Sequence, residues 1–257
     1  MRIYCRKAGK EILSYLQYKR IMYWLYVIEY ANFNCQEEFN EELTSEGFRQ
    51  GGLGMGITEI NYDYWRFYNN NCSLVPNGYT NEFGNRTNTK AITIVIPTVD
   101  GGESTSSITM QVVRWRGFDN PFGDIWTNLD GIIINSIDIV AVNNKKYIKV
   151  YATDDPLFYS DSDYSKMRVV GLELQDSGKI KEWDLGNTAE IIPRLHEKAS
   201  YTQYKCSMHF GNTTSTLKTL FINGAAHIIS GLGTYDSGYN TNYVGNNIGF
   251  HSSCIIK

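Results

Sequence analysis

The sequence predicts an α+β protein, with a helical N-terminal segment over residues 1–60 packed on a main domain over residues 61–257. Apolar residues recur at roughly helical spacing over residues 10–45, where no Gly or Pro occurs. Further along the chain, short apolar runs alternate with Gly, Asn and Asp turns, which is typical of short strands. Helix and strands in separate parts of the chain define the α+β class.

The helix predicted over residues 10–45 should stop before Gly47, since glycine commonly ends helices. Residues 47–60 are rich in glycine but lack the Lys-Ser/Thr ending of a phosphate-binding loop. We therefore interpret them as a turn system whose backbone packs closely against its neighbours.

Strands are expected over residues 91–97 and 108–117, followed by a short buried helical turn that includes Ile125, Trp126 and Leu129. Residues 131–153 alternate in polarity on both sides of Asn143-Asn144, which predicts a hairpin with these two residues at its turn. Residues 154–168 read as an acidic loop. Further short strands are expected over residues 169–174, 219–224 and 248–256.

The charge balance and the hydrophobic pattern exclude two classes of partner. The net charge of −3 gives no basic face for general nucleic-acid binding. The most apolar stretch, residues 21–33, is too short to cross a bilayer and is interrupted by Glu29, so no membrane insertion is expected. No signal peptide with an apolar core follows the basic N-terminus.

No pattern in the chain indicates catalysis, a metal or a cofactor. The five widely spaced cysteines predict reduced thiols made in a cytoplasm, and no CxxC or HExxH motif occurs. No GxSxG elbow is present, so the protein is not expected to be an enzyme. The acidic residues 154–164 lack the spacing of an EF-hand, and a solvated loop is favoured over a calcium site.

A compositional gap marks the C-terminal region. The 31 residues GAAHIISGLGTYDSGYNTNYVGNNIGFHSSC, from residue 224 to residue 254, contain no Lys, Glu, Gln, Met or Trp. These five types make up 45 of the 257 residues, so about five would be expected in a window of this length. A loop rich in Gly and Asn that lacks them by chance is the alternative.

Several long motifs carry a resemblance that covers the whole chain: YWLYVIEYANFNCQEEFNEELTSEGFRQGGLGMG, PNGYTNEFGN, RWRGFDNPFGDIWTNLDGI and IGFHSS. With them the chain resembles the variable proteins of diversity-generating retroelements from phages and prophages of gut Bacteroidales, similar to the major tropism determinant group. The resemblance implies a C-type-lectin-like, formylglycine-generating-enzyme-like fold that ends in a variable region. The chain departs from the family pattern at two points. No Trp follows the glycines, and His251 stands where relatives often have Arg.

The resemblance also implies a cause for the compositional gap. In such retroelements adenine-directed copying turns Asn-type codons into NNY codons. NNY codons specify every residue type except Lys, Glu, Gln, Met and Trp, which are the five types absent from residues 224–254.

Under this hypothesis the region divides into a scaffold and a set of variable, ligand-binding positions. The scaffold is formed by glycines, which permit tight passage, and by apolar anchors: Gly224, Gly231, Leu232, Gly233, Ile248, Gly249 and Phe250. The variable positions have the Tyr, Asn and Ser composition of antibody loops. They are Ala225, Ala226, His227, Ile228, Ile229, Ser230, Tyr235, Tyr239, Asn240, Thr241, Asn242, Tyr243, Asn246, Asn247 and His251.

The resemblance implies a phage-encoded protein that binds a bacterial surface protein or glycan through this face, on a virion tail or fibre or on the host-cell surface. A homotrimer is expected by analogy with fibre-type receptor binders. Two alternatives stay open. One is a structural virion protein whose tyrosine-rich face is buried in the particle. The other is an enzyme of the formylglycine-generating type, which would need a cysteine site built from Cys206 or Cys254.

Overall fold

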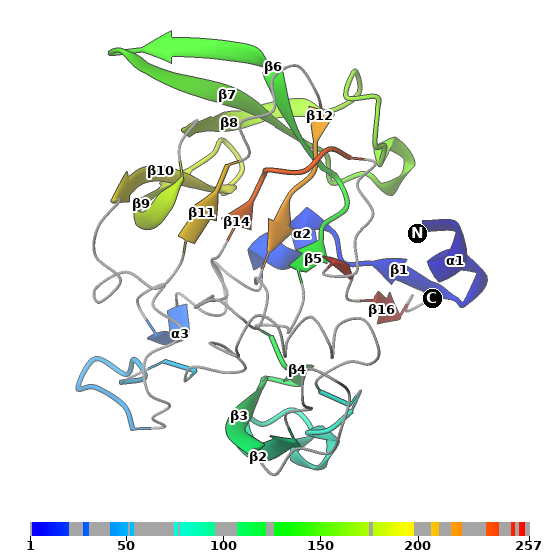
Figure 1. Ribbon diagram of the computed structural model, residues 1–257, viewed down its shortest axis with the longest axis vertical. Coiled ribbons are helices and arrows are strands. Elements are labelled where there is room, and N and C mark those ends of the chain that lie inside the picture. The colour runs from blue at the N-terminus through cyan, green and yellow to red at the C-terminus, as the bar shows by residue number, and fades with distance from the viewer. Residues whose placement is uncertain are drawn as a thin grey trace.

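The computed structural model is mostly β-sheet with a few short helices (Figure 1), and this confirms the predicted class at the level of an α+β or mainly β protein. Within the described residues, no helix has both the length and the apolar character needed to span a bilayer. The structure describes residues 2–20, 28–30, 42–50, 52–53, 75–76, 78–95, 107–121, 126–174, 177–197, 207–210, 217–222, 235–241, 248–249 and 252–254.

Among its described residues, the N-terminal segment contains three short helices and one strand. They are α1 (Arg2–Lys7), β1 (Lys10–Ile12), α2 (Tyr15–Lys19) and α3 (Ile28–Tyr30). β1 pairs antiparallel with β16 (Ser252–Cys254), so segments near both ends of the chain lie side by side (Figure 1). The boundary predicted at residue 60 lies outside the described residues.

The prediction of one helix over residues 10–45 is therefore wrong at its start, where residues 10–12 form β1. The helix begins only after Ser14, whose side-chain oxygen accepts from the backbone N–H of Gln17 while the Gln17 side chain accepts from the Ser14 N–H. This capping box satisfies donors that no helical carbonyl reaches, and it fixes the start of α2. The strand partner comes from the other end of the chain, which the local apolar period does not reveal. At the far end, Leu43 forms a β-bridge with Arg49.

Four sheets make up the β-structure of the part of the chain that the structure describes. A seven-stranded sheet has the order β10-β9-β11-β14-β13-β5-β15, a four-stranded sheet has the order β12-β6-β7-β8, and a three-stranded sheet has the order β2-β3-β4. β1 and β16 form the fourth. The strands of the seven-stranded sheet are β5 (Trp126–Asn128), β9 (Gly178–Leu185), β10 (Ile191–Glu197), β11 (Ser207–His209), β13 (Phe221–Ile222), β14 (Tyr235–Asp236) and β15 (Ile248–Gly249).

The four-stranded sheet contains the longest hairpin among the described residues. Its strands are β6 (Ile132–Val142), β7 (Lys145–Ala152), β8 (Arg168–Leu174) and β12 (Leu217–Lys218). The predicted hairpin is confirmed, because Asn143 and Asn144 form its turn with φ of 49° and 62°. Two consecutive positive φ values are the requirement of a type I′ turn, and Asn tolerates them. A short 3-10 helix, η3 (Pro156–Phe158), follows in the acidic loop.

The three-stranded sheet lies apart from the other sheets in Figure 1. It contains β2 (Asn88–Val95), β3 (Ser107–Trp115) and β4 (Phe118–Asp119), preceded by the 3-10 helix η2 (Asn81–Phe83). The two longer strands confirm the predicted strands near residues 91–97 and 108–117. Thr80 donates a hydrogen bond to Asp119, and the Gly78 N–H donates to the same carboxylate at 3.1 Å, so β4 is tied to the turn before η2.

The helical turn predicted around Trp126 is wrong, because Trp126–Asn128 form strand β5 between β13 and β15. Trp126 and Leu129 are buried as expected, but Ile125 lies outside the described residues. Three apolar residues between turns suit a strand as well as a helical turn, and here the pairing on both sides decides. Strands β9 and β10 were not predicted at all.

One apolar core joins the seven-stranded and four-stranded sheets to helix α2. The Tyr15 and Tyr18 rings of α2 are almost fully buried in it. The Tyr15 hydroxyl donates to the backbone oxygen of Ile191 at 3.3 Å and accepts from the Ile191 N–H at 3.0 Å, so this buried polar group is satisfied at the edge of β10. The rest of the core includes Trp115, Leu129, Ile134, Ile148, Val150, Ile180, Met208, Leu220 and Ile222.

Candidate ligand-binding face

Residues 235–241 are the part of the predicted variable region whose structure is best described. Strand β14, at the start of this segment, runs parallel to β11 and antiparallel to β13. It is an interior strand of the seven-stranded sheet, so its backbone is paired on both sides. The segment after β14 is therefore presented from a fixed frame, which is the arrangement that loop-based recognition needs.

The two residues at the centre of this segment are anchors. Asp236 and Ser237 are buried, and the Ser237 side chain has no exposed surface. The Ser237 N–H donates to the His209 carbonyl oxygen at 2.9 Å, and its hydroxyl donates to Oε1 of Glu173 at 2.7 Å. Neither residue was among the predicted scaffold or variable positions, although its burial makes it part of the scaffold.

A cluster of buried ionisable groups lies beneath the segment. Burial raises the pKa of Glu173 to about 7, against the opposing effect of the Ser237 hydrogen bond, and raises that of Asp236 to about 6. Burial also lowers the pKa of Lys218, whose Nζ donates to the Gly238 carbonyl oxygen at 3.3 Å. Lys218 favours the charged form of both carboxyl groups, but desolvation outweighs it.

The residues that follow the anchors are partly exposed. Backbone hydrogen bonds attach Tyr239 and Thr241: the Thr219 N–H donates to the Tyr239 oxygen at 3.3 Å, and the Thr241 N–H donates to the Leu217 oxygen at 3.2 Å. A β-bridge joins Asn240 to Lys218. Backbone attachment fixes the position of the segment without depending on which side chains it carries.

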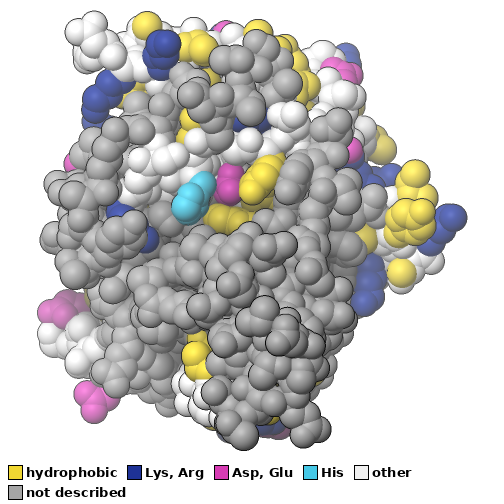
Figure 2. Space-filling view, in the orientation of Figure 1, with side chains coloured by type: hydrophobic (Ala, Val, Ile, Leu, Met, Phe, Trp, Pro, Cys, Tyr) yellow, Lys and Arg dark blue, Asp and Glu magenta, His cyan; other side chains and the backbone are white. Residues whose placement is uncertain are grey.

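Aromatic groups support both ends of this segment. The Tyr239 ring meets the Phe221 ring edge to face, with centroids 5.7 Å apart, and Trp126 meets His209 in the same way at 5.7 Å. Burial, followed by the charge of Lys179, lowers the pKa of His209. Figure 2 shows a histidine, an acidic side chain and hydrophobic side chains gathered near the centre of this view, among residues that are not described.

Most of the other predicted binding residues lie outside the described residues. They are Ala225, Ala226, His227, Ile228, Ile229, Ser230, Asn242, Tyr243, Asn246, Asn247 and His251. Tyr235 lies on β14 opposite Met208 and Ile222, but its side chain is not described. The structure thus brings Tyr239, Asn240 and Thr241 together on one short segment.

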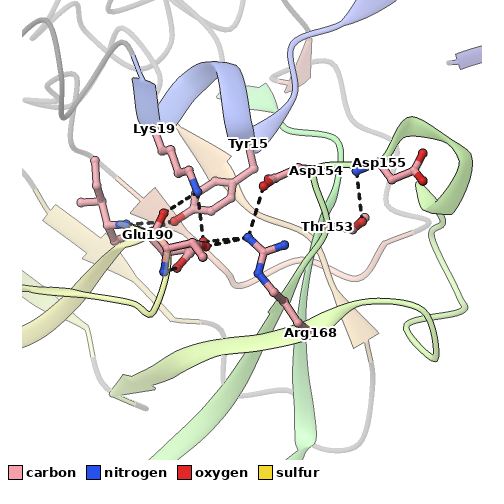
Figure 3. Close-up of polar contacts among 9 residues, drawn as sticks. Tyr15, Lys19, Thr153, Asp154, Asp155, Arg168 and Glu190 are labelled. Carbon is pink, nitrogen blue, oxygen red and sulfur yellow. Dashed lines mark hydrogen bonds and ion pairs between the residues drawn. The ribbon is translucent and has the colours of Figure 1, made fainter.

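A second buried ionic cluster, which sequence reasoning missed, joins α2 to the β9–β10 turn (Figure 3). Lys19 from α2 and Arg168 from β8 both donate to Oε1 of Glu190, each at 3.0 Å. Burial alone would raise the pKa of Glu190, but hydrogen bonds from Thr188 and Lys19 lower it to about 2. Lys19 and Glu190 are almost fully buried, so the cluster holds elements together rather than meeting a ligand.

The acidic loop uses its carboxylates for local bonds. Asp155 caps η3 by accepting from the Leu157 N–H at 2.9 Å, Asp154 pairs with Arg168, and Asp161 pairs with Arg2. In the part of the chain that the structure describes, no group of three or more His, Cys, Asp or Glu side chains could hold a metal ion.

The architecture defines a mainly β protein with short helices and a partly exposed C-terminal segment over buried anchors. Comparison of the chain with protein-family models, with curated proteins and with solved structures finds no match.

Proposed function

We propose that this protein recognises a bacterial surface protein or glycan through a variable face formed by residues 224–254. The observation that carries the proposal is the absence of Lys, Glu, Gln, Met and Trp from these residues. This gap is the signature that adenine-directed diversification would leave in the protein. The C-type-lectin-like fold, display on a virion or host-cell surface, and a homotrimeric state are parts of the same proposal.

Residues 236–241 divide into buried anchors and partly exposed positions, and this division supports the proposal. Asp236 and Ser237 are buried and bonded through their side chains, whereas Tyr239, Asn240 and Thr241 are partly exposed and attached through their backbones. Backbone hydrogen bonds hold part of this face, and such bonds do not depend on which side chains it carries. Tyrosine and asparagine on such a face provide large contact area and adaptable hydrogen bonds.

The neighbouring DNA tests the origin of the variation. We expect a reverse transcriptase gene and a near-copy of the codons for residues 224–254 that differs mainly where the copy carries adenine. Copies of this gene from related genomes should differ at Tyr239, Asn240 and Thr241 and agree at the scaffold glycines. Differences spread evenly over the chain would contradict diversification.

Binding to whole cells tests recognition itself. The full chain is fluorescently labelled and titrated against a panel of gut Bacteroidales strains, with and without protease or periodate treatment of the cells. Replacing Tyr239, Asn240 and Thr241 together by Ala should weaken binding by about tenfold or more, since aromatic anchors dominate such interfaces. The exposed Glu182→Ala on β9 is the matched control and should bind like the wild type. Equal binding by both variants to every strain would contradict the proposed face.

A further inference from the structure

The tip of the β6–β7 hairpin carries apolar side chains in solvent together with positive charge. We define this ribbon tip as residues 137–146. Ile137 is 62% exposed, Ile139 45% and Val142 41%. Lys145 and Lys146 are also exposed, and among the described residues neither forms an ion pair. Figure 1 shows the hairpin extending beyond the rest of the fold at the top of the view. Several exposed apolar residues on one projecting element indicate a contact surface.

A second surface of the same chain has the opposite charge and equally exposed apolar side chains. The first ten residues of the acidic loop, 154–163, contain four Asp and no Lys or Arg. Leu157 is 87% exposed and Phe158 39%. Arg168 and Arg2 neutralise Asp154 and Asp161. Asp155 accepts from the Leu157 N–H, and Asp163 accepts from the N–H and the side chain of Ser165, so neither forms an ion pair among the described residues.

These two surfaces cannot meet within one molecule. Lys145 and Lys146 of the ribbon tip begin β7 and the acidic loop follows β7, so these charges lie at opposite ends of an eight-residue strand. At 3.3 Å a residue, this strand separates them by about 25 Å. The acidic loop is also held at the base of the hairpin, where Arg2 bonds Asp130 and Asp161 together.

We propose that the ribbon tip of one copy of this chain docks on the acidic loop of a second copy. Lys145 and Lys146 face Asp155 and Asp163 of the neighbour, and the exposed apolar side chains of the two surfaces cover one another. Opposite charge on the two patches selects this pairing over contact between two identical tips or two identical loops. Because the patches differ, each copy can offer its tip to one neighbour and its loop to another, which builds a ring or a longer chain. This inference does not depend on what the variable face binds.

Light scattering of the full-length protein over a concentration series tests the proposal. The wild type should associate, and the association should weaken as salt is added, because the paired charges are exposed. Lys145→Glu with Lys146→Glu, or Asp155→Lys with Asp163→Lys, should weaken association by about tenfold or more. The control reverses two exposed charges away from both surfaces, Arg20→Glu at the end of α2 with Arg86→Glu after η2, and should associate like the wild type. Circular dichroism verifies that every variant is folded.

Mixing the two charge-reversed variants gives the decisive result. In the mixture, the reversed tip of one variant meets the reversed loop of the other, and each wild-type tip meets a wild-type loop. The mixture should therefore associate although each variant alone does not. A wild type that stays monomeric at its highest soluble concentration overturns the proposal. So does retention of the oligomer by both variants, or failure of the mixture to associate.

Discussion

The hydroxyl of Ser237 donates a 2.7 Å hydrogen bond to Oε1 of Glu173, and both side chains are buried. Glu173 lies on β8 of the four-stranded sheet, and Ser237 follows β14 of the seven-stranded sheet. This bond therefore connects the proposed variable region to the second sheet. It places a titratable group directly below residues that are proposed to differ between copies of the gene.

The raised pKa of Glu173 predicts how stability depends on pH. A carboxyl group whose pKa is higher in the folded protein than in the unfolded chain contributes to stability at low pH. For Glu173 this contribution is complete below pH 4.5, the pKa in the unfolded chain, and it is lost as the pH rises through about 7. The rise in the pKa of Glu173 from 4.5 to about 7 corresponds to about 3 kcal/mol in the free energy of unfolding. Asp236, raised to about 6, acts in the same direction at lower pH, whereas the lowered pKa of His209 acts in the opposite direction.

The variant Glu173→Gln isolates this contribution, because the amide oxygen still accepts from Ser237 and cannot ionise. Urea unfolding at pH 5, 6, 7 and 8 should show the wild type losing stability relative to Glu173→Gln as the pH rises. His209 and Asp236 are present in both proteins, so their effects largely cancel in the difference. A difference in unfolding free energy that is constant with pH would show that Glu173 does not titrate in this range.

The Lys19–Glu190–Arg168 cluster predicts a large cost for removing one charge. Glu190→Gln should lower the free energy of unfolding by about 3 kcal/mol, since it leaves Lys19 buried without its carboxylate partner. The exposed Glu182→Gln on β9 serves as the control and should change it by less than about 0.5 kcal/mol. If Glu190→Gln behaves like Glu182→Gln in denaturant unfolding, the cluster contributes nothing to stability.

Acid should weaken the same cluster. The folded pKa of Glu190 is lowered to about 2, so its contribution is present above the unfolded value of 4.5 and is lost as pH falls through 2. The difference between wild type and Glu190→Gln should therefore shrink between pH 4.5 and pH 2. This trend is opposite in sign to that of Glu173, and the two variants can be measured in the same buffers.

Local patterns in the sequence predicted the elements whose structure depends on neighbouring residues. The hairpin turn at Asn143-Asn144 is an example, because the residues that form the turn also supply its positive φ values. Strands β2 and β3 follow from their own alternation. β1 and β5 could not be predicted in this way, because residues distant in the chain, on β16, β13 and β15, determine that they are strands.

The same limit applies to the candidate site. The composition of residues 224–254 indicated a region, and three of its predicted positions, Tyr239, Asn240 and Thr241, are partly exposed. The anchors were missed because the partners of Ser237 lie on β8 and β11. A single signal was available: Glu173 is a charged residue within the otherwise apolar run VVGLEL, where a buried carboxyl group requires a partner.

Gly131 should be the more sensitive of two glycines that share a left-handed conformation. Its φ is +78°, and a Cβ there would lie 2.7 Å from the Tyr159 ring and 2.9 Å from the Thr153 oxygen. Gly9 has a φ of +68° with open space around it. Both Ala variants incur about 1–2 kcal/mol for the backbone conformation, and Gly131→Ala should lose at least about 1 kcal/mol more from crowding. Equal thermal unfolding shifts for the two variants would contradict the close packing at Gly131.

A codon library tests whether the segment after β14 separates into anchors and a tolerant face. NNY codons are introduced either at Tyr239, Asn240 and Thr241 or at Asp236 and Ser237, and each library is displayed on yeast and sorted for protease resistance. The first library should keep most members folded, because these positions are partly exposed and the backbone hydrogen bonds to Thr219 and Leu217 do not depend on the side chain. The second should retain few, since replacing Ser237 leaves the buried Glu173 without its donor, at a cost of about 1–3 kcal/mol.

Deep sequencing before and after sorting measures the surviving fraction of each library. Similar survival in the two libraries would remove the structural basis for calling residues 239–241 a variable face. Survival confined to the first library would mean that diversification can act there without loss of the fold.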